Sequence, residues 1–418
     1  MSASIDKVTI NTNIDSSLSF GYSSLVMPTC RLDATVAFLK KWPATIKAFP
    51  NAVHIVYDGL AENISQSYML AIKSHSNKIH VHAWDALFIG EEYNESLLEV
   101  LPLSIQKLNE GGIKCFSTKD SSIRSYGFIV AAVYANFVSK FSINPDDHVI
   151  YTLDDDCLPI FDDKGNCDFF LKHAQNLLKF NPWSSTVPGI RVRGFPYYTF
   201  SNSDHSNIDV VMSMGMWKGI PDFDAVQRLG LGVNSDSVEL PLIRESVLAH
   251  REVIHPICGM NLAFKVSMLP AALFAPMGTA SKYKRFDDIW FGLFAQAVLK
   301  LANKDWCYGQ PLIYHDRLSA PLDCLVAETP GIKLNEVLWM YINDAVSNSL
   351  SSGQVLDNTS IMSAAKFVLK AMSSYKNMAN DLPNYFAVYG SSCLEYAELW
   401  CECISNWINM LNTHVFSD

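Results

Sequence analysis

The first half of the chain alternates short apolar runs with stretches in which apolar residues recur at helical spacing. The apolar runs lie at residues 24–27, 53–57, 79–84 and 148–153. The helical stretches lie at residues 33–42, 86–108 and 120–139. This order of strand and helix predicts a parallel sheet with helices on its faces. Because ligands of such sheets bind at the carboxyl ends of the strands, the residues that follow each run are the first candidates for a site.

The second half of the chain has a different pattern. Residues 191–320 are richer in glycine, proline and aromatic residues, which is typical of substrate-binding loops around an antiparallel edge. Within them, 289–301 is a strongly apolar helical run and 311–314 a short apolar strand. Beyond about residue 330 only helical spacing remains, at residues 335–350, 361–375 and 394–411.

These patterns together predict an α/β fold. We expect a Rossmann-type, mostly parallel sheet flanked by helices, with an added helical C-terminal region. The predicted divisions are a flexible N-terminal arm at residues 1–20, an α/β domain at 21–328 and the helical region at 329–418. At 49% hydrophobic residues, the chain has enough apolar material for a core of this size.

Composition narrows the classes of function. The formal net charge is −10 and no block of Lys and Arg stands out, which argues against a nucleic-acid partner. Residues 1–20 lack the basic start and apolar run of a secretory signal, and no apolar stretch is long enough to cross a bilayer. The ten cysteines form no CxxC pair, so we interpret them as mostly buried free thiols in a reducing compartment. These features predict a cytoplasmic protein.

Three consecutive aspartates, Asp154, Asp155 and Asp156, follow the apolar run at 148–153 directly. Three carboxylates at the end of a buried strand are unfavourable unless a positive group compensates them. A Mg²⁺ or Mn²⁺ ion shared with a substrate diphosphate would do so, with one aspartate facing the nucleotide ribose and the last one the metal. A solvated acidic turn is the alternative interpretation, but the position after a central strand favours the metal site.

Further motifs occur in a fixed order with this triplet, and together they resemble the reversibly glycosylated polypeptide family, which includes plant UDP-arabinopyranose mutases. Single motifs such as the aspartate triplet are weak signals, whereas CGMNLAF and the ordered set are specific. Residues 79–112 and the helical C terminus diverge from the family or are additions. The matching segments are LVMPT at 25–29 with Arg31, VYDG at 56–59, KDS at 119–121 with Arg124, Tyr126 and Gly127, DDDC at 154–157, VRGFP at 192–196, Trp217 with IPDFD at 220–224, CGMNLAF at 258–264, RFDDIW at 285–290, and Tyr314-His315 with Ser319 and Pro321.

The resemblance implies a GT-A-type domain that binds a nucleotide-diphosphate sugar, most simply a UDP-sugar, and a divalent Mn²⁺ or Mg²⁺ ion. The metal would be held by Asp156 and His315, with Asp154 beside them, although a lone histidine is more often structural. Asp287 and Asp288 would aim at sugar or acceptor hydroxyls, although Asp287 can simply cap the following helix. The implied nucleotide-sugar contacts are Pro28, Thr29, Arg31, Asp58, Lys119, Asp120, Arg124, Asp154, Asp155, Trp217 and Asn261.

Several of these assignments have a structural alternative. Lys119 and Asp120 fit a loop-to-helix corner that reaches the uridine and phosphates, but they equally fit a helix cap. Arg124 lies on the helix that follows, where an ion-paired arginine is the plain alternative. Trp217 can stack on a sugar or pack in the core. Asn261 is the best candidate for direct contact within a segment that otherwise builds a pocket wall.

Arg193 is the residue that the resemblance associates with self-glycosylation. A guanidinium is a poor nucleophile because it stays protonated at neutral pH, so an equally physical role is to clamp the departing diphosphate. The chain carries Phe200 and Met214 where plant members carry arginine and histidine. These departures bear on mutase activity and on the identity of the sugar more than on nucleotide-sugar binding.

The predicted chemistry is departure of UDP from the sugar, stabilised by the metal, Arg193 and Arg124. Rejoining in another ring size would make the protein a mutase, and transfer to its own chain a self-glycosylating protein. Transfer to an external sugar or polysaccharide hydroxyl would make it an ordinary glycosyltransferase. Two hypotheses from other classes are a non-catalytic nucleotide-sugar-binding subunit and a metal-dependent phosphohydrolase. The helical C terminus offers Trp400, Trp407 and Leu411 as a stripe for homo- or hetero-oligomers, or as ordinary core.

Overall fold

The computed structural model of the protein describes most of the chain. Both the N-terminal arm and the segment that contains Arg193 fall outside the described residues. The described residues are 20–90, 95–140, 142–179, 208–220, 222–231, 246–251, 253–255, 257–316, 320–356, 360–375 and 390–416.

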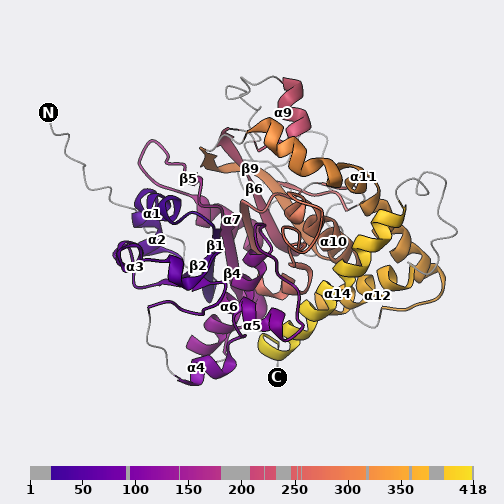
Figure 1. The fold of residues 1–418 in the computed structure, drawn as a ribbon, viewed down its shortest axis with the longest axis horizontal. Helices are drawn as coiled ribbons and strands as arrows, with labels where there is room; N and C mark the ends of the chain where they lie inside the picture. Colours follow the sequence, from indigo (N-terminus) through magenta and orange to yellow (C-terminus); the bar gives the residue numbers. More distant parts are fainter. Residues whose placement is uncertain are drawn as a thin grey trace, which may run out of the picture.

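The strands of the described residues form one nine-stranded sheet (Figure 1). Its order is β3-β2-β1-β4-β8-β6-β9-β5, and β7 pairs with β9 off this path. The strands are β1 (Tyr22–Thr29), β2 (Ala52–Tyr57), β3 (Ile79–Ala83), β4 (His148–Leu153), β5 (Cys157–Pro159), β6 (Val210–Gly219), β7 (Ser246–Leu248), β8 (Asn261–Lys265) and β9 (Asp305–His315).

The first four strands in the order are parallel, and the directions mix beyond them. β1 pairs in parallel with β2 and β4, and β2 with β3. β8 then runs antiparallel to both β4 and β6, whereas β6 and β9 are parallel. The predicted parallel sheet therefore holds from β3 to β4, and the predicted antiparallel part begins at β8. All six residues of β4 are buried, as a strand covered on both faces requires.

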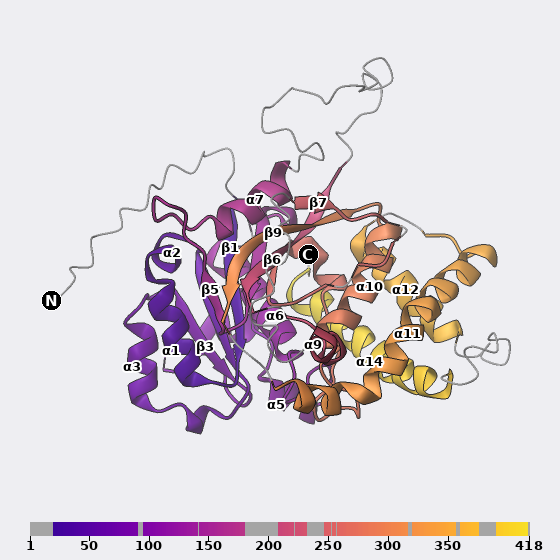
Figure 2. The same cartoon turned by 90° about the horizontal axis from the view of Figure 1, so that it is seen from above.

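Helices cover both faces of the sheet, so the α/β class is confirmed. In Figure 2 the helices α1, α2 and α3 lie at one end of the sheet and α11, α12 and α14 at the other. The helices are α1 (Leu32–Lys41), α2 (Pro43–Ala48), α3 (Gln66–Lys73), α4 (Glu95–Val100), α5 (Ile105–Glu110), α6 (Ile123–Val138), α7 (Phe169–Lys179), α9 (Ala225–Leu231), α10 (Asp287–Leu301), α11 (Pro321–Ser351), α12 (Ile361–Tyr375) and α14 (Gly390–His414), with short 3₁₀ turns η2 (Ala61–Asn63), η3 (Pro145–Asp147) and η6 (Val266–Ala271).

Alternation along β1 separates two hydrophobic cores. Val26 joins the core under α6, whereas Leu25 and Met27 join the core under α1 and α7. Helix α6 lies very close to the sheet, because a Cβ atom at Gly127 would come within 2.6 Å of Val26 and 2.7 Å of Val56. Glycine at this position therefore permits the approach of the helix that leads into the site.

The C-terminal helices belong to the core on the α6 face. Trp400, Trp407 and Leu411 are fully buried in the same cluster as residues of α6 and α10, so this stripe is core packing. The indole Nε1 of Trp407 donates to the carbonyl oxygen of Leu269 in η6 at 2.7 Å. The predicted division at residue 328 falls inside α11, which continues through Pro330.

Most elements lie where the hydrophobic pattern predicts them. β4 has the predicted bounds, and β1, α1, α6 and α10 differ from prediction by a few residues at their ends. The stretch at 86–108, predicted as mainly helical, contains the short α4 and the start of α5. The nine cysteines seen in the described part of the chain are free, and only Cys30 is exposed. No helix of the described residues is long and apolar enough to cross a membrane.

Candidate active site

The predicted site residues after β1, β2 and β4 meet at one edge of the sheet. Thr29, the last residue of β1, is the register partner of Tyr57, the last residue of β2. β4 lies on the other side of β1 and points the same way. Because parallel strands end at a common edge, Thr29, Asp58 and the aspartates after Leu153 lie together. Pro28 is half-buried within β1 beside Thr29.

Asp155 is bound by two residues at and just beyond the end of β1. The Thr29 hydroxyl donates to its Oδ2 atom at 2.6 Å, and the Arg31 guanidinium binds both of its oxygens. Burial raises the pKa of Asp155, although the hydrogen bond from Thr29 and the charge of Arg31 oppose this. The same guanidinium donates from Nη2 to Asp156 at 3.0 Å, so Arg31 braces two of the three aspartates.

Asp154 is paired with Arg124, whose side chain is only 3% exposed. This guanidinium also donates to the hydroxyl of Thr152 at 3.1 Å and to the carbonyl oxygen of Gly259. It lies 5.1 Å from the ring centroid of Phe274, a cation–π distance. Burial raises the pKa of Asp154, and the charge of Arg124 acts against that rise. Arg124 thus joins α6, β4 and the loop before β8 in the ion-paired arrangement that the sequence left as an alternative.

Strand pairing places the backbone of Asp156 beside the end of β9, where His315 lies. Cys157, the residue after Asp156, is the register partner of His315 in the β5–β9 ladder. The Nδ1 atom of His315 lies 2.8 Å from the carbonyl oxygen of Ile220. Since a carbonyl can only accept, Nδ1 carries the proton and the lone pair of the neutral ring is at Nε2. A histidine oriented in this way is typical of metal ligands.

The donor set of Asp156 and His315 therefore fits a divalent cation that also binds substrate oxygens. Carboxylate oxygen and neutral imidazole are suitable partners for Mn²⁺. No group of three or more His, Cys, Asp or Glu residues with metal-binding geometry occurs among the residues that the structure describes. Asp154, the third predicted ligand, is engaged by Arg124. Asp156 and His315 stay the predicted metal ligands.

The loop before α6 contacts the residue that follows β2. The backbone N–H of Lys119 donates to Oδ2 of Asp58 at 2.8 Å, and Lys119 adopts a left-handed φ of 63°. Its side chain is exposed, so the ammonium group is accessible to a ligand. Burial raises the pKa of Asp58. Asp120 accepts hydrogen bonds from Ser122 and from the backbone of Met277, which ties this loop to the segment before α10.

The two aspartates at the start of α10 have different environments. Asp287 is buried and accepts hydrogen bonds from the backbone N–H of Ser121, at 2.7 Å, and from the Ser121 hydroxyl. Asp288 accepts from the backbone N–H of Gly259 at 3.0 Å. Burial, followed by the charge of Asp287, raises the pKa of Asp288 to about 7. Asp287 thus anchors the loop before α6, while Asp288 has the pKa of a group that exchanges protons near neutrality.

Asn261 and Trp217 lie deeper than the other predicted contacts. Asn261 is fully buried, and its amide donates to the carbonyl oxygen of Met216 at 2.8 Å. Its Oδ1 atom accepts from Nε2 of His173 at 2.9 Å, so both ends of the amide are engaged. Trp217 is half-buried beside the α1-face core, and its indole nitrogen has no hydrogen-bond partner among the described residues.

Two partners in this site were not foreseen from the sequence. Ser121 engages Asp287, and Ile220 orients His315; both belong to segments that matched the family, but no role was attached to them. Met214, the departure from the plant pattern, is buried on β6 and accepts from the N–H of Cys258 at 3.2 Å. Arg193 and Phe200 lie outside the described residues, so their predicted roles stay predictions.

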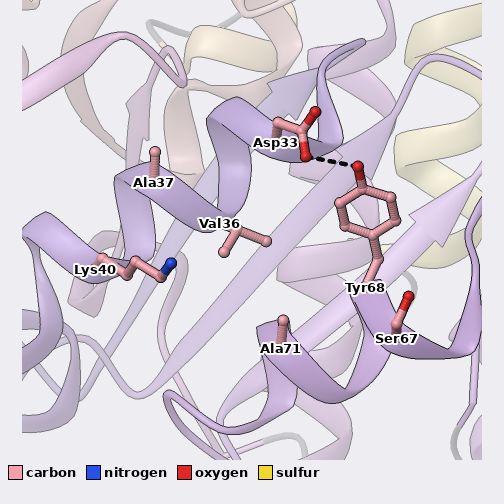
Figure 3. Close-up of a pocket in the computed structure, with 7 residues that line it drawn as sticks. All are labelled: Asp33, Val36, Ala37, Lys40, Ser67, Tyr68 and Ala71. Atoms are coloured by element: carbon pink, nitrogen blue, oxygen red, sulfur yellow. Dashed lines mark hydrogen bonds between the residues drawn. The ribbon is translucent and has the colours of Figure 1, made fainter.

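A separate surface cavity of about 320 Å³ lies between α1 and α3. Figure 3 shows its rim, where the Tyr68 hydroxyl donates to the Asp33 carboxylate at 2.5 Å. None of the aspartates after β4 lines this cavity. The predicted site is therefore the edge of the sheet and not this groove.

Comparison with known sequences gives a consistent set of relatives. A family profile described as "Reversibly glycosylated polypeptide" matches residues 85–403. UDP-arabinopyranose mutase 2 of Arabidopsis thaliana is 27% identical over 391 residues, which cover 90% of this chain and 91% of the relative. Probable UDP-arabinopyranose mutase 1 of Pisum sativum is 26% identical over 304 residues, which cover 70% and 74% respectively.

Solved structures show more distant likenesses. Glucosyl-3-phosphoglycerate synthase from Mycobacterium tuberculosis, in complex with Mn²⁺, UDP and phosphoglyceric acid, has a TM-score of 0.38 at 11% identity and covers 76% of this chain and 78% of its own. S. aureus TarS 1-349 in complex with UDP-GlcNAc has a TM-score of 0.35 at 11% identity and covers 93% and 90%. The sequence relatives, and not these structures, therefore carry the assignment that follows.

Proposed function

The chain belongs to the reversibly glycosylated polypeptide family, and from this premise we propose that it is a metal-dependent UDP-sugar enzyme of the mutase type. It would cleave the bond between the sugar and the diphosphate of a UDP-sugar and rejoin the two with a changed sugar ring. The named relatives are UDP-arabinopyranose mutases, which supports this reaction class. The observation that carries the proposal is the orientation of His315 by Ile220 beside the strand that begins right after Asp156.

The metal site is the first part of the proposed mechanism. Asp156 and His315 would hold a Mn²⁺ or Mg²⁺ ion, which supplies positive charge for the diphosphate when it is bound. Arg31 keeps Asp156 in place while neutralising Asp155. Because Arg31 and Arg124 pair with the three aspartates, these carboxylates repel a diphosphate less strongly than three unpaired aspartates would.

Nucleotide binding falls to the ends of β1 and β2. Asp58, fixed by the N–H of Lys119, would accept a hydrogen bond from the base, and the exposed Lys119 ammonium would approach the phosphates. Arg124 would contribute indirectly. Its buried guanidinium holds Asp154, which would face the ribose, so Arg124 itself would not need to contact the ligand. Arg193 retains its predicted role as a clamp on the departing diphosphate.

Asp288 is the proposed proton carrier. Its carboxyl group lies at the first turn of α10, receives the Gly259 N–H, and has a pKa of about 7, raised by burial and by Asp287. A group with that pKa can accept a proton from a sugar hydroxyl and return it within one reaction cycle. Asp287 and Ser121 would hold the helix start at a constant distance from the loop before α6.

Transfer to an external hydroxyl is the second candidate function. Met214 occupies the position where plant members carry histidine, and it is buried against Cys258. A polar group is therefore missing from the wall between β6 and β8, which favours a changed sugar or acceptor.

We propose that residues 21–328 carry the nucleotide-sugar chemistry and that the C-terminal helices support it.

Intact-protein mass spectrometry tests the proposal directly. The protein is incubated with Mn²⁺ and a panel of nucleotide sugars, and the same mixtures are chromatographed. Conversion of one UDP-pentose isomer into another, or a mass increment of one sugar that is lost in Arg193→Ala, is the expected result. Release of UDP only when an acceptor is added would instead identify an ordinary glycosyltransferase. Binding without any turnover across the panel would favour a non-catalytic subunit.

A further inference from the structure

Arg285 lies two residues before helix α10, which begins with Asp287 and Asp288. Its backbone adopts a left-handed φ of 67°, which is unfavourable for a non-glycine residue. Such a conformation persists where surrounding contacts enforce it, and it clusters at functional positions. Its guanidinium is 43% exposed, in contrast to the buried Arg124.

A buried carboxylate on the C-terminal helix α11 holds this arginine. Oε1 of Glu328 accepts from Nε of Arg285 at 2.9 Å, and Oε2 accepts from the backbone N–H of Ala225 at 2.8 Å. The Glu328 side chain is only 5% exposed, so both of its oxygens are needed by protein partners. One side chain thus joins α11, the start of α9 and the loop before α10.

A second contact on the same face of α11 fixes the distance between this helix and the loop before α10. Gly331, three residues after Glu328, packs so closely that a Cβ atom there would come within 2.6 Å of the Phe286 ring. Phe286 is the residue next to Arg285 and is buried. Helix α11 therefore contacts Arg285 through an ion pair and Phe286 through a close backbone approach.

This geometry engages only one side of the guanidinium. Among the described residues, the terminal Nη1 and Nη2 atoms of Arg285 form no hydrogen bond, so the planar pair of donors remains for a ligand. Burial lowers the pKa of Arg285, but the hydrogen bond to Glu328 and the charge of that carboxylate outweigh this effect and raise it. Asp222 accepts from the thiol of Cys258 at 3.3 Å.

Glu328 links Arg285 to the segment around Asp222, because its second oxygen binds the N–H of Ala225, three residues after Asp222. Asp222 is two residues beyond Ile220, which exchanges two backbone-directed hydrogen bonds with His315, at 2.8 and 3.0 Å. Cys258 precedes Gly259, the partner of Asp288. Contacts therefore connect Arg285 to the segment that orients the proposed metal ligand His315, and Arg285 stands three residues before the proposed proton carrier Asp288.

We propose that Arg285 binds the diphosphate of the UDP-sugar through its two terminal nitrogens and that Glu328 is the positioning residue that aims it. The inference rests on the proposed function and adds a cation to it. A planar guanidinium pre-set by a buried carboxylate matches two phosphate oxygens and loses little freedom on binding. The C-terminal helix α11 thereby takes part in the substrate site, although its sequence carries none of the expected contacts.

Calorimetric titration with UDP and with UMP in the presence of Mn²⁺ tests this role without requiring turnover. The variant Arg285→Gly removes the side chain and relieves the left-handed backbone, so loss of binding cannot arise from strain. We expect UDP affinity to fall about 10–100-fold and UMP affinity to change less than about twofold, because UMP lacks the second phosphate. Glu328→Gln, which leaves Arg285 in place, is expected to lower UDP affinity about 3–10-fold.

The matched control is the pair of Arg251 and Asp305 at the start of β9. There a 36% exposed arginine likewise sits on a 5% exposed carboxylate, away from the site. Arg251→Lys is expected to leave both affinities unchanged. Unchanged UDP affinity in Arg285→Gly, or an equal loss for UDP and UMP, would overturn the proposal. Wild-type protein that binds no UDP would contradict the proposed function before any variant is compared.

Discussion

The Nδ1 atom of His315 donates to the carbonyl oxygen of Ile220 across 2.8 Å, while the N–H of Ile220 donates to the carbonyl oxygen of His315 at 3.0 Å. This reciprocal pair fixes both the ring plane and the tautomer of the histidine. It leaves Nε2 as the only nitrogen of the ring that can coordinate a cation. The partner that orients His315, Ile220, directly follows β6 and lies 95 residues before the histidine in the chain.

The first prediction concerns this ligand. His315→Ala should weaken Mn²⁺-dependent binding of UDP about 10–100-fold, because it removes the prepared nitrogen donor. Isothermal titration with UDP at several Mn²⁺ concentrations measures the effect. Asp156→Asn should give a similar loss, whereas uridine, which has no phosphate, should bind equally to all three proteins. Metal-independent UDP binding by the wild-type protein would contradict the assignment.

The second prediction separates structure from ligand binding at Arg124. Its guanidinium is 3% exposed and engages Asp154, Thr152 and Gly259. Arg124→Met should therefore destabilise the fold by about 1–3 kcal/mol, because it leaves the half-buried Asp154 carboxylate and the Gly259 carbonyl without their charged partner. The double variant Arg124→Met with Asp154→Asn should recover part of that loss. Urea unfolding followed by circular dichroism measures both, and additive losses would show that the two residues are not coupled.

The third prediction uses the pKa of Asp288. Burial and the charge of Asp287 raise the pKa of Asp288 to about 7, so the carboxylate is ionised above that pH. If it accepts the substrate proton, kcat/KM should fall about tenfold for each pH unit below about 7. Asp288→Asn should abolish turnover while leaving UDP affinity within about threefold. A pH–rate profile that is flat between 5.5 and 8 would argue against this role.

The same pKa has a consequence for stability. A carboxyl group with a raised pKa binds its proton more tightly in the folded than in the unfolded state. Its contribution is therefore present at low pH and is lost as the pH rises through about 7. Asp288→Asn should make the unfolding free energy less dependent on pH between about 4 and 7. Thermal unfolding across that range is the measurement, with Asp146→Asn at an exposed position as the control.

The fourth prediction concerns acid sensitivity. Burial lowers the pKa of His148 to about 3, so this ring stays neutral in the folded protein while it titrates in the unfolded chain. Its contribution is present above the unfolded pKa and is lost as pH falls below about 6.5. By linkage His148 should account for about 2 kcal/mol of lost stability between pH 7 and 5.

Replacement of the ring tests that figure. His148→Gln should remove most of the acid-induced loss attributed to His148, and denaturant unfolding at pH 7, 6 and 5 measures it. The exposed His250→Gln is the matched control and should leave the loss unchanged. An unaltered pH dependence in His148→Gln would show that the acid-sensitive groups lie elsewhere.

The sequence by itself determined the elements of the sheet and the edge at which the site lies. β4 and its three aspartates were predicted with the correct bounds, because a continuous apolar run and a sudden change to charge are local signals. The order of the family motifs likewise predicted which segments contribute to the site. A local sequence pattern reflects side-chain burial and strand propensity, and these two properties decide where a strand ends.

Only the tertiary structure decided which charges pair with one another within the protein. Arg124 finds Asp154 thirty residues away, and Arg31 finds Asp155 across 124 residues. Asn261, predicted to contact the substrate, is buried and its amide group is bonded to His173 and to the carbonyl of Met216. Glu328 reaches Arg285 from a helix whose sequence showed only apolar spacing. Such pairings depend on distances between elements far apart in the chain, and no local pattern of residues encodes those distances.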